Sequence, residues 1–328
     1  MSHVTRWART WSCSWTVTDY NPAVNNSTAL LVLPQRTLLE FTGRDRATFL
    51  HNFTTNDIKA LTPGQGCEAF AANIKGRIIA HLWIFVTENA IRVDAAPGMG
   101  PALLKHFDKY IITEDVQIAD RSESRQSGLL VGPTAAELIA ACGGATPAKS
   151  MGSYTCTGPL EISRVDWTVP DCFLVTCAKD AADAVWKSFQ VAGAVRADER
   201  WEALRIAHGY PQDGVDLSGE MLVHEANRTP QTVSFRKGCY LGQEPIARLD
   251  ALGHANRLLQ TLELTGERPQ PGTIVQDTDG QDLGRVTSSA TDPRTGLSHA
   301  LALLKRTATA GTVVFWEGQR QGVVQKTA

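Results

Sequence analysis

The sequence lacks the charge imbalance and the long apolar runs that would assign it to several common classes. Its 328 residues carry 32 lysines and arginines against 34 aspartates and glutamates, a formal net charge of −2. This balance predicts no general attraction to nucleic acid or to an anionic membrane, and leaves open a local basic groove. The longest strongly apolar run, Ile78 to Val86, is interrupted by His81 and is too short to span a bilayer. We therefore expect no membrane association.

The seven cysteines follow no recognisable pattern. Their number is odd and no C-x-x-C pair occurs, so neither a disulfide framework nor a zinc ribbon is indicated, and a reducing compartment fits best. Cys172 and Cys177 enclose the apolar residues Phe173 to Val175, a pattern typical of a buried strand. We predict that both are core residues, and no metal site is predicted anywhere in the chain.

Several catalytic motifs are also missing. No Walker A loop, G-x-G-x-x-G fingerprint, H-E-x-x-H helix or G-x-S-x-G elbow occurs. His224 and Glu225 begin like the zinc-protease motif, but Arg228 stands where its second histidine would be. Nucleotide-binding, zinc-protease and esterase functions therefore have no motif to support them.

The composition is that of a globular protein, with 43% hydrophobic and 20% charged residues. The length predicts two or three domains. Residues 1–27 differ from the rest: Trp7, Trp11 and Trp15 recur at helical spacing, and Asp19 is the only acid. We expect a poorly structured N-terminal extension there, with an organelle transit peptide as the alternative.

From residue 28 to 250 strands and helices interleave without regular β-α-β spacing, which predicts an α+β fold. Strands are expected at residues 29–33, 37–41, 67–74, 77–87, 90–94, 116–118, 129–131, 160–165 and 173–176. Helices are expected after Gly43 and at residues 101–110, 135–142, 179–192 and 198–208. The interval from Gly143 to Gly158, rich in Gly, Ser, Thr and Pro, predicts a flexible connection.

The C-terminal part, residues 251–328, has a different pattern. Six short segments with strand character alternate with turns rich in Gly, Pro and Asp, at residues 258–264, 273–276, 283–290, 300–304, 312–315 and 322–325. This pattern predicts a separate small antiparallel β-barrel or sandwich.

One stretch, Ser234 to Arg248, gathers most of the chemically able side chains. Gly238 and Gly242 flank Cys239-Tyr240-Leu241, so the thiol is expected at a sharp bend. Three cations stand near it in the sequence and would favour its thiolate form: Arg236, Lys237 and Arg248. Glu244 before Pro245 indicates the start of a helix. The alternative is a glycine-rich turn around a buried, inert cysteine.

The run K-G-C-Y-L-G-Q-E from Lys237 to Glu244, followed by Ala247-Arg248, resembles the signature of the YgfZ-type folate-binding proteins of iron-sulfur cluster assembly and repair. These proteins are similar in fold to the glycine-cleavage T-protein, an aminomethyltransferase that uses tetrahydrofolate. The resemblance extends from about Thr28 onward. Further segments that carry it are Phe41 to Asp57, Val223 to Asn227, Asp282 to Ser288 and Leu301 to Arg306.

The resemblance implies two interlocked α+β subdomains and a C-terminal antiparallel β-barrel around a folate-sized cleft. It implies tetrahydrofolate or a one-carbon derivative as ligand, and iron-sulfur client enzymes or cluster-assembly proteins as partners of a cytoplasmic monomer. A mitochondrial matrix location is the alternative. The functional residues carried over are Cys239 as the key thiol, Lys237 and Glu244. Those expected to bind the cofactor are Asn56, Asp57, Asn227, Tyr240, Gln243 and Arg248.

Two departures from the T-protein pattern argue against aminomethyl transfer. Val93-Asp94-Ala95 aligns with a T-protein strand end, and the acid expected after it is replaced by Pro101. The R-x-E-x-G segment becomes Arg205 to Gly209, with Ala207 in place of the glutamate. Neither replacement can act as a general acid. A folate-dependent aminomethyltransferase and a non-catalytic interaction module with a vestigial cleft stay open as alternatives.

Overall fold

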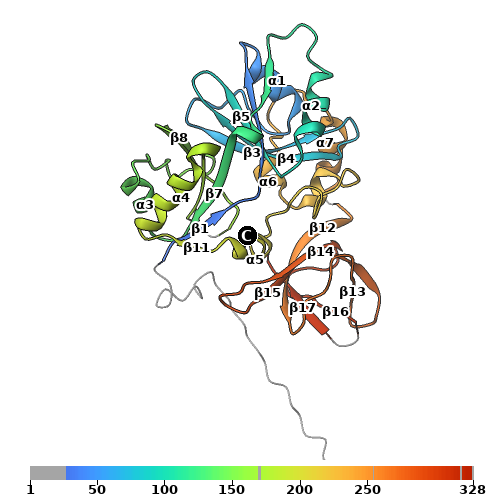
Figure 1. The fold of residues 1–328 in the computed structure, drawn as a ribbon. Coiled ribbons are helices and arrows are strands. Elements are labelled where there is room, and N and C mark those ends of the chain that lie inside the picture. Colours follow the sequence, from blue (N-terminus) through green and yellow to red (C-terminus); the bar gives the residue numbers. More distant parts are fainter. Residues whose placement is uncertain (1–26, 169–170, 254, 318–319, 327–328) are drawn as a thin grey trace, which may run out of the picture.

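The computed structural model describes residues 27–168, 171–253, 255–317 and 320–326, so the extension expected over residues 1–27 lies outside them except for Ser27. Two β-sheets, their helices and a C-terminal barrel make up this part of the chain (Figure 1). One sheet has five antiparallel strands in the order β3-β4-β5-β2-β6. Its strands are β2 (Thr37–Thr42), β3 (Gly66–Ala72), β4 (Ile78–Val86), β5 (Ile91–Ala95) and β6 (Gln117–Asp120). The meander expected from the sequence, β3 to β5, is present.

The second sheet has six strands in the order β11-β1-β7-β10-β9-β8. They are β1 (Ala29–Val32), β7 (Arg125–Val131), β8 (Tyr154–Thr157), β9 (Leu160–Arg164), β10 (Cys172–Ala178) and β11 (Val195–Arg196). Only the β1 and β11 pair is parallel in this sheet. Because the chain forms β1, builds the five-stranded sheet and then returns as β7, the two sheets are interlocked.

Strand β8 corrects the expectation of a flexible connection over residues 143–158. Tyr154 is buried, stacks on Phe85 with 5.8 Å between ring centroids, and pairs with Ser163 of β9. A strand this short and polar is ordered by its neighbours, because it has no alternating apolar pattern of its own.

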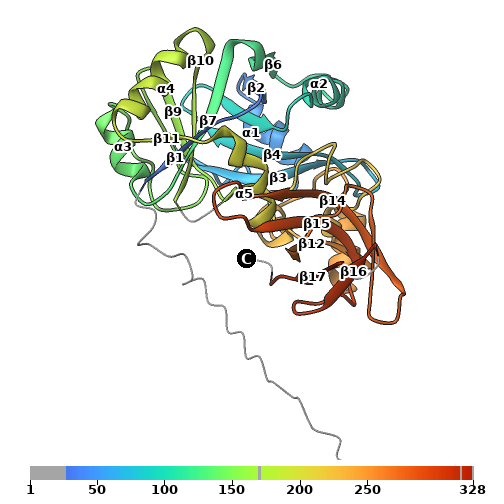
Figure 2. The same ribbon diagram turned by 60° about the horizontal axis from the view of Figure 1, so that its bottom comes forward.

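The α-helices in the described ranges are α1 (Arg46–Phe53), α2 (Gly100–Asp108), α3 (Ala135–Ala141), α4 (Ala182–Val191), α5 (Trp201–Ala207), α6 (Thr229–Thr232) and α7 (Gln243–Ala251). Helices α1 to α4 cover the outer faces of the two sheets (Figures 1 and 2). Phe49 of α1 and Phe107 of α2 pack on the five-stranded sheet, whereas Ile139 of α3 and Trp186 of α4 pack on the six-stranded sheet. The sheets therefore form the two inner layers and face each other.

Alternation along the strands decides what lies between the sheets. In β5, Ile91 and Val93 point to the helices, so Arg92 and Asp94 must point to the other sheet. In β4, Trp83 and Phe85 point the same way and join Leu174 and other apolar residues of the six-stranded sheet in a shared core. The interior between the sheets thus contains both aromatic and charged side chains.

The C-terminal strands close into a barrel in the order β12-β15-β14-β13-β16-β17, as the sequence predicts. They are β12 (Arg257–Thr265), β13 (Ile274–Gln276), β14 (Asp282–Thr291), β15 (Ser298–Lys305), β16 (Val313–Trp316) and β17 (Arg320–Val324). Leu262, Val275 and Trp316 fill its core. Helix α5 packs against β14 and β15 and joins the barrel to the sheets (Figure 2). The fold is α+β with a C-terminal antiparallel barrel.

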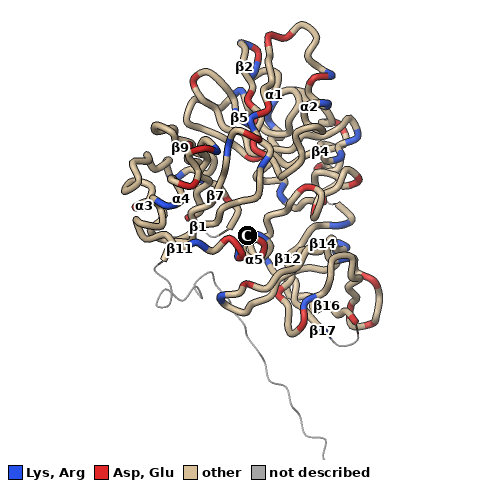
Figure 3. Tube along the Cα trace, viewed as in Figure 1, with Lys and Arg blue, Asp and Glu red and all other residues tan. Residues whose placement is uncertain are grey.

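Charged residues of both signs are interspersed along the trace (Figure 3). No helix in the described ranges has the length and apolar character needed to cross a membrane.

Candidate functional site

A cavity of about 340 Å³ lies between the two sheets and is lined by residues of both. We call it the inter-sheet cavity. Phe85 and Leu174 supply apolar walls from opposite sheets, and Arg92 and Glu161 supply charges. Its position follows from the strand alternation, because these side chains all point away from the helices.

Ion pairs line this cavity, and one of them, between Glu161 and Arg92, joins the two sheets. Glu161 of β9 pairs with Arg92 of the facing sheet and with Arg125 of its own sheet. Glu40 of β2 lies 3.0 Å from Arg121 and 3.7 Å from Arg92, measured between the nearest charged atoms. The guanidinium of Arg92 thus lies between the carboxylates of Glu40 and Glu161, which compensate its positive charge. All three side chains line the cavity.

Two donor atoms beside the cavity are buried without a strong hydrogen-bond partner among the described residues: Nε of Arg92, and the hydroxyl of Tyr154, which has only the weak thiol of Cys156 beside it. Buried polar groups are nearly always satisfied, so each such atom requires an explanation. Burial raises the pKa of Tyr154 to about 12, and its hydroxyl therefore stays protonated at neutral pH. Both atoms are donors that a ligand with carbonyl or carboxylate oxygens would satisfy.

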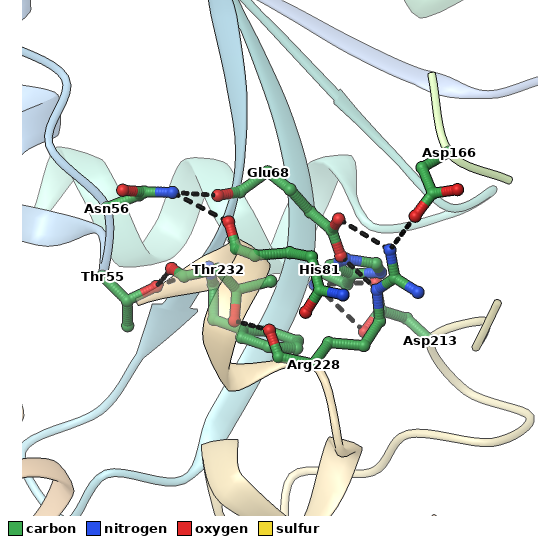
Figure 4. Close-up of polar contacts among 10 residues, drawn as sticks. Thr55, Asn56, Glu68, His81, Asp166, Asp213, Arg228 and Thr232 are labelled. Atoms are coloured by element: carbon green, nitrogen blue, oxygen red, sulfur yellow. Dashed lines mark hydrogen bonds and ion pairs between the residues drawn. The ribbon is translucent and has the colours of Figure 1, made fainter. Parts of the chain in front are cut away.

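A second polar feature, shown in Figure 4, is a charged cluster of the buried residues Glu68, His81 and Arg228 with the half-buried Asp166. Arg228 Nη2 donates to Glu68 Oε2 at 2.8 Å, and His81 Nε2 lies 2.6 Å from Glu68 Oε1. Burial alone would raise the pKa of Glu68, but Arg228 and His81 outweigh it and hold the pKa at about 2. Asp166 lies 3.5 Å from Arg228 and 2.7 Å from His208. The charged cluster therefore links β3 and β4, which carry Glu68 and His81, to the segments that follow β9 and α5.

Two further carboxylates lie close to this cluster. Both oxygens of Asp213 accept the backbone N–H of His81, at 3.0 and 3.2 Å, and burial raises the pKa of Asp213 to about 6. Asp94 accepts two bonds from Arg36 Nε at 2.7 and 3.0 Å. The Arg36 guanidinium stacks over Trp167 at 4.4 Å from the ring centroid. The Asp94 that aligns with the T-protein strand end is thus engaged in a buried ion pair.

In the signature, Lys237 is buried and points at the end of α1. Its Nζ donates to the carbonyl oxygens of His51, Thr54 at 2.7 Å and Asn56 at 2.8 Å. It also lies 4.7 Å from the ring centroid of Tyr240. Burial lowers the pKa of Lys237 to about 8, although three carbonyl acceptors favour its charged form. This corrects the expected placement of Lys237 around the thiol, because all three ammonium protons are used elsewhere.

Cys239 is exposed, as are Arg236, Glu244 and Arg248. The alternative of a buried cysteine is therefore wrong, and the reactivity of the thiol stays a prediction. None of the charged residues Arg236, Glu244 and Arg248 forms an ion pair with another described residue. Cys172 and Cys177 are buried as expected, and burial raises their pKa to about 12 and about 11. Accessibility is what distinguishes Cys239 from these thiols.

The two glycines of the signature differ. Gly242 has a φ of +82°, and a Cβ atom there would lie 2.4 Å from the carbonyl oxygen of Asn73. Gly238 has no positive φ, and the nearest atom to its hypothetical Cβ is His51 Nε2 at 4.0 Å. The expected strain therefore applies to Gly242 only. Glu244 lies in the first turn of α7, as the Glu-Pro pair predicts.

The residues expected to bind the cofactor do not line the inter-sheet cavity. Asn56 Nδ2 donates to the carbonyl oxygens of Glu68 at 2.8 Å and Gln231 at 3.0 Å, and Asp57 lies 3.2 Å from His51 Nδ1. These contacts fix the polar corner after α1. The corner is thereby joined to the segment that precedes the signature.

The other expected residues lie in or near the signature. Asn227 has a left-handed φ of 57° and donates to Leu259 O at 3.1 Å. Gln243 Oε1 accepts the Tyr240 N–H at 3.3 Å, and Tyr240 is buried. Arg248 is exposed, so the residues expected to bind the cofactor lie partly in the interior and partly at the surface. That these residues bind the cofactor stays a prediction.

The sequence reasoning did not find Arg92, Tyr154 and Glu161. A signal exists for Arg92, since a charged residue between Ile91 and Val93 in a strand must face something polar. The same signal exists for Glu161, which stands between Leu160 and Ile162 in β9. Tyr154 gives no such signal, because its burial depends on the facing sheet.

Comparison with known proteins shows to which family the chain belongs. A family profile described as the GCVT N-terminal domain matches residues 1–237. The chain belongs to this T-protein-like family. Within this family it is of the YgfZ type: it is 27% identical over 264 residues to the tRNA-modifying protein YgfZ of Klebsiella pneumoniae, covering 78% of this chain and 79% of that protein. It is 25% identical over 267 residues to its namesake from Serratia proteamaculans, with 80% of each covered.

Two further T-protein-like relatives are informative. A chloroplastic protein of Arabidopsis thaliana, named as a transferase, is 31% identical over 296 residues, covering 87% of this chain and 67% of that protein. The crystal structure of glycine cleavage system aminomethyltransferase T from Bartonella henselae superposes with a TM-score of 0.81 at 19% identity, covering 92% of this chain and 85% of that one. This likeness establishes the T-protein-like fold.

Proposed function

We propose that this protein binds tetrahydrofolate or a one-carbon derivative in the inter-sheet cavity. The size of about 340 Å³ suits a pterin ring with part of its aromatic tail. Phe85 and Leu174 offer apolar faces to a planar ring, and the carboxylates of Glu161 and Asp94 can accept its amino and ring N–H groups. The observation that carries the proposal is the buried Tyr154 hydroxyl, which has only the weak thiol of Cys156 as partner and can donate to a ring carbonyl.

A matched pair of variants tests this site. Tyr154→Phe removes the buried hydroxyl beside the inter-sheet cavity, and Tyr240→Phe removes another buried hydroxyl, which lies outside it. By calorimetry we expect roughly micromolar binding of tetrahydrofolate, weakened about fivefold or more by Tyr154→Phe and unchanged by Tyr240→Phe. The reverse pattern would favour the signature residues as the folate site, and no heat at millimolar folate would remove folate from the proposal.

We further propose that the protein supports assembly or repair of iron-sulfur clusters in client enzymes through the exposed thiol of Cys239. Two relatives carry the name tRNA-modifying protein, which supports an iron-sulfur enzyme of tRNA modification as one client. Lys237 holds the turn on α1, so its contribution is to position Cys239. One thiolate cannot complete the usual cluster ligation, so a client or carrier supplies the others.

Cells without this protein provide the test. The activity of cluster-dependent enzymes should be restored by the wild-type chain and not by Cys239→Ser. Cys156→Ser is the matched control, because Cys156 is the other exposed cysteine among the described residues. Full restoration by Cys239→Ser would show that the thiol is dispensable and would favour the interaction module.

The fold likeness to aminomethyltransferase T supports aminomethyl transfer as a second candidate function. Pro101 stands in the first turn of α2 and Ala207 is the last residue of α5, and neither side chain can move a proton. We therefore expect no ammonia release above background from an aminomethylated lipoyl carrier and tetrahydrofolate. Steady turnover would establish the enzyme.

For location we propose the cytoplasm, with the mitochondrial matrix as the alternative if residues 1–27 act as a transit peptide. The chloroplastic relative supports an organelle as a possibility for this family. Fractionation of cells that express the full chain and a chain lacking residues 1–27 distinguishes the two.

A further inference from the structure

A second cavity, of about 420 Å³, lies where the signature helix α7 meets the barrel. It shares no lining residue with the inter-sheet cavity, and we call it the α7 cavity. The lining residues that matter here are His224, Thr229, Pro230, Asp250, Leu258 and Arg306. They come from the 3₁₀ helix η5 (Val223–Ala226), from α6 and α7, and from the barrel.

His224 is the unusual residue of this cavity. Its side chain belongs to a residue only 9% exposed, and neither ring nitrogen has a hydrogen-bond partner in the described part of the chain. Burial lowers its pKa, which the charge of Asp250 only partly opposes, so the ring is neutral at neutral pH. A neutral imidazole offers one donor and one acceptor nitrogen. A buried group with both unused is explained if a ligand supplies the partners.

Two opposite charges also face this cavity. Asp250 stands in the last turn of α7, where the negative end of the helix dipole disfavours a carboxylate. Arg306 follows β15 and is exposed. Neither forms an ion pair with another residue that the structure describes, nor do the two pair with each other. Neither charge therefore stabilises the fold through an ion pair.

We propose that the α7 cavity binds a small zwitterion of the α-amino-acid class with an apolar side chain. The ammonium group pairs with Asp250 and the acceptor nitrogen of His224. The carboxylate pairs with Arg306, and the side chain packs on the apolar wall formed by Pro230 and Leu258.

Other ligand classes leave part of this arrangement unsatisfied. A simple anion would meet the repulsion of Asp250, and a divalent cation would meet that of Arg306. An uncharged apolar molecule would leave both nitrogens of the buried His224 without partners. Only a ligand with both charges on one small body satisfies all three residues.

Calorimetry on the full chain tests the proposal with three probes. L-Leucine carries both charges, leucinamide lacks the carboxylate, and 4-methylpentanoate lacks the ammonium group. We expect L-leucine to bind with a Kd of about 1 mM or below, and each analogue to bind about tenfold more weakly. Absence of heat with L-leucine at about 20 mM, or equal binding of all three, would overturn the proposal.

Two variants locate the charges. Arg306→Gln should remove the preference for L-leucine over leucinamide, and Asp250→Asn should remove the preference over 4-methylpentanoate, each a change of about tenfold. Arg285→Gln, at another exposed arginine of the barrel, is the matched control and should change neither preference. Thermal melting verifies that each variant is folded. If both preferences survive in folded Arg306→Gln and Asp250→Asn, the α7 cavity is not the binding site.

Discussion

The ion pair between Glu68 and Arg228 should be the most costly single contact of the charged cluster to break. Glu68→Gln keeps the shape of the side chain and removes the charge that compensates a buried guanidinium. The Glu68 pKa falls from a usual 4.5 to about 2 in the fold. At about 1.4 kcal/mol per pKa unit, that shift is worth about 3 kcal/mol at neutral pH. Removing one partner of a buried pair typically costs about 3–5 kcal/mol, which agrees.

The cost should depend on pH in a defined direction. Because the folded pKa of Glu68 lies below the unfolded one, its stabilisation is fully present above about pH 4.5 and is lost as pH falls toward 2. The difference in unfolding free energy between wild type and Glu68→Gln should therefore shrink from about 3 kcal/mol at pH 7 to about 1 kcal/mol at pH 3. Urea unfolding, followed by the fluorescence of the buried Trp83 and Trp167, measures it.

Two controls make this prediction specific. Glu220→Gln breaks an exposed pair with Arg77 and should cost less than about 1 kcal/mol at either pH. Arg228→Met added to Glu68→Gln should recover part of the loss, since no unpaired buried charge then remains. A cost for Glu68→Gln below about 1 kcal/mol at pH 7, or one that does not shrink at pH 3, would refute the reasoning.

Three further outcomes follow from the same structure. Gly242→Ala should cost more than about 2 kcal/mol in urea unfolding, whereas Gly238→Ala should stay within about 1 kcal/mol; equal costs would contradict the assigned backbone strain. Iodoacetamide should label Cys239 well before Cys172 in a mass-spectrometric time course, and simultaneous labelling would contradict their exposure. The folded pKa of Asp213, about 6, is raised, so the wild type should lose about 2 kcal/mol of stability as pH rises from 4 to 6. Asp213→Asn should abolish this slope in urea unfolding, and an unchanged slope would assign it elsewhere.

Most of the regular structure follows from local sequence patterns. The alternation in Ile91 to Ala95 and the spacing of the six C-terminal segments are local patterns, and each strand formed where its own pattern indicated. Glu244 and Pro245 favour the start of a helix, and Gly242 favours the turn before it. Both preferences depend only on the backbone conformation of a few neighbouring residues, so the sequence indicates them.

The positions of the polar and charged side chains in the interior follow only from the packing of segments that are distant in the sequence. Lys237 donates to the carbonyl of His51, 186 positions earlier in the chain, and nothing near Lys237 in the sequence indicates that acceptor. Tyr154 is buried because Phe85 of the facing sheet covers it. Local sequence fixes which face of a strand a side chain occupies. What that face meets depends on the packing of distant segments, and this packing placed Arg92 between two carboxylates.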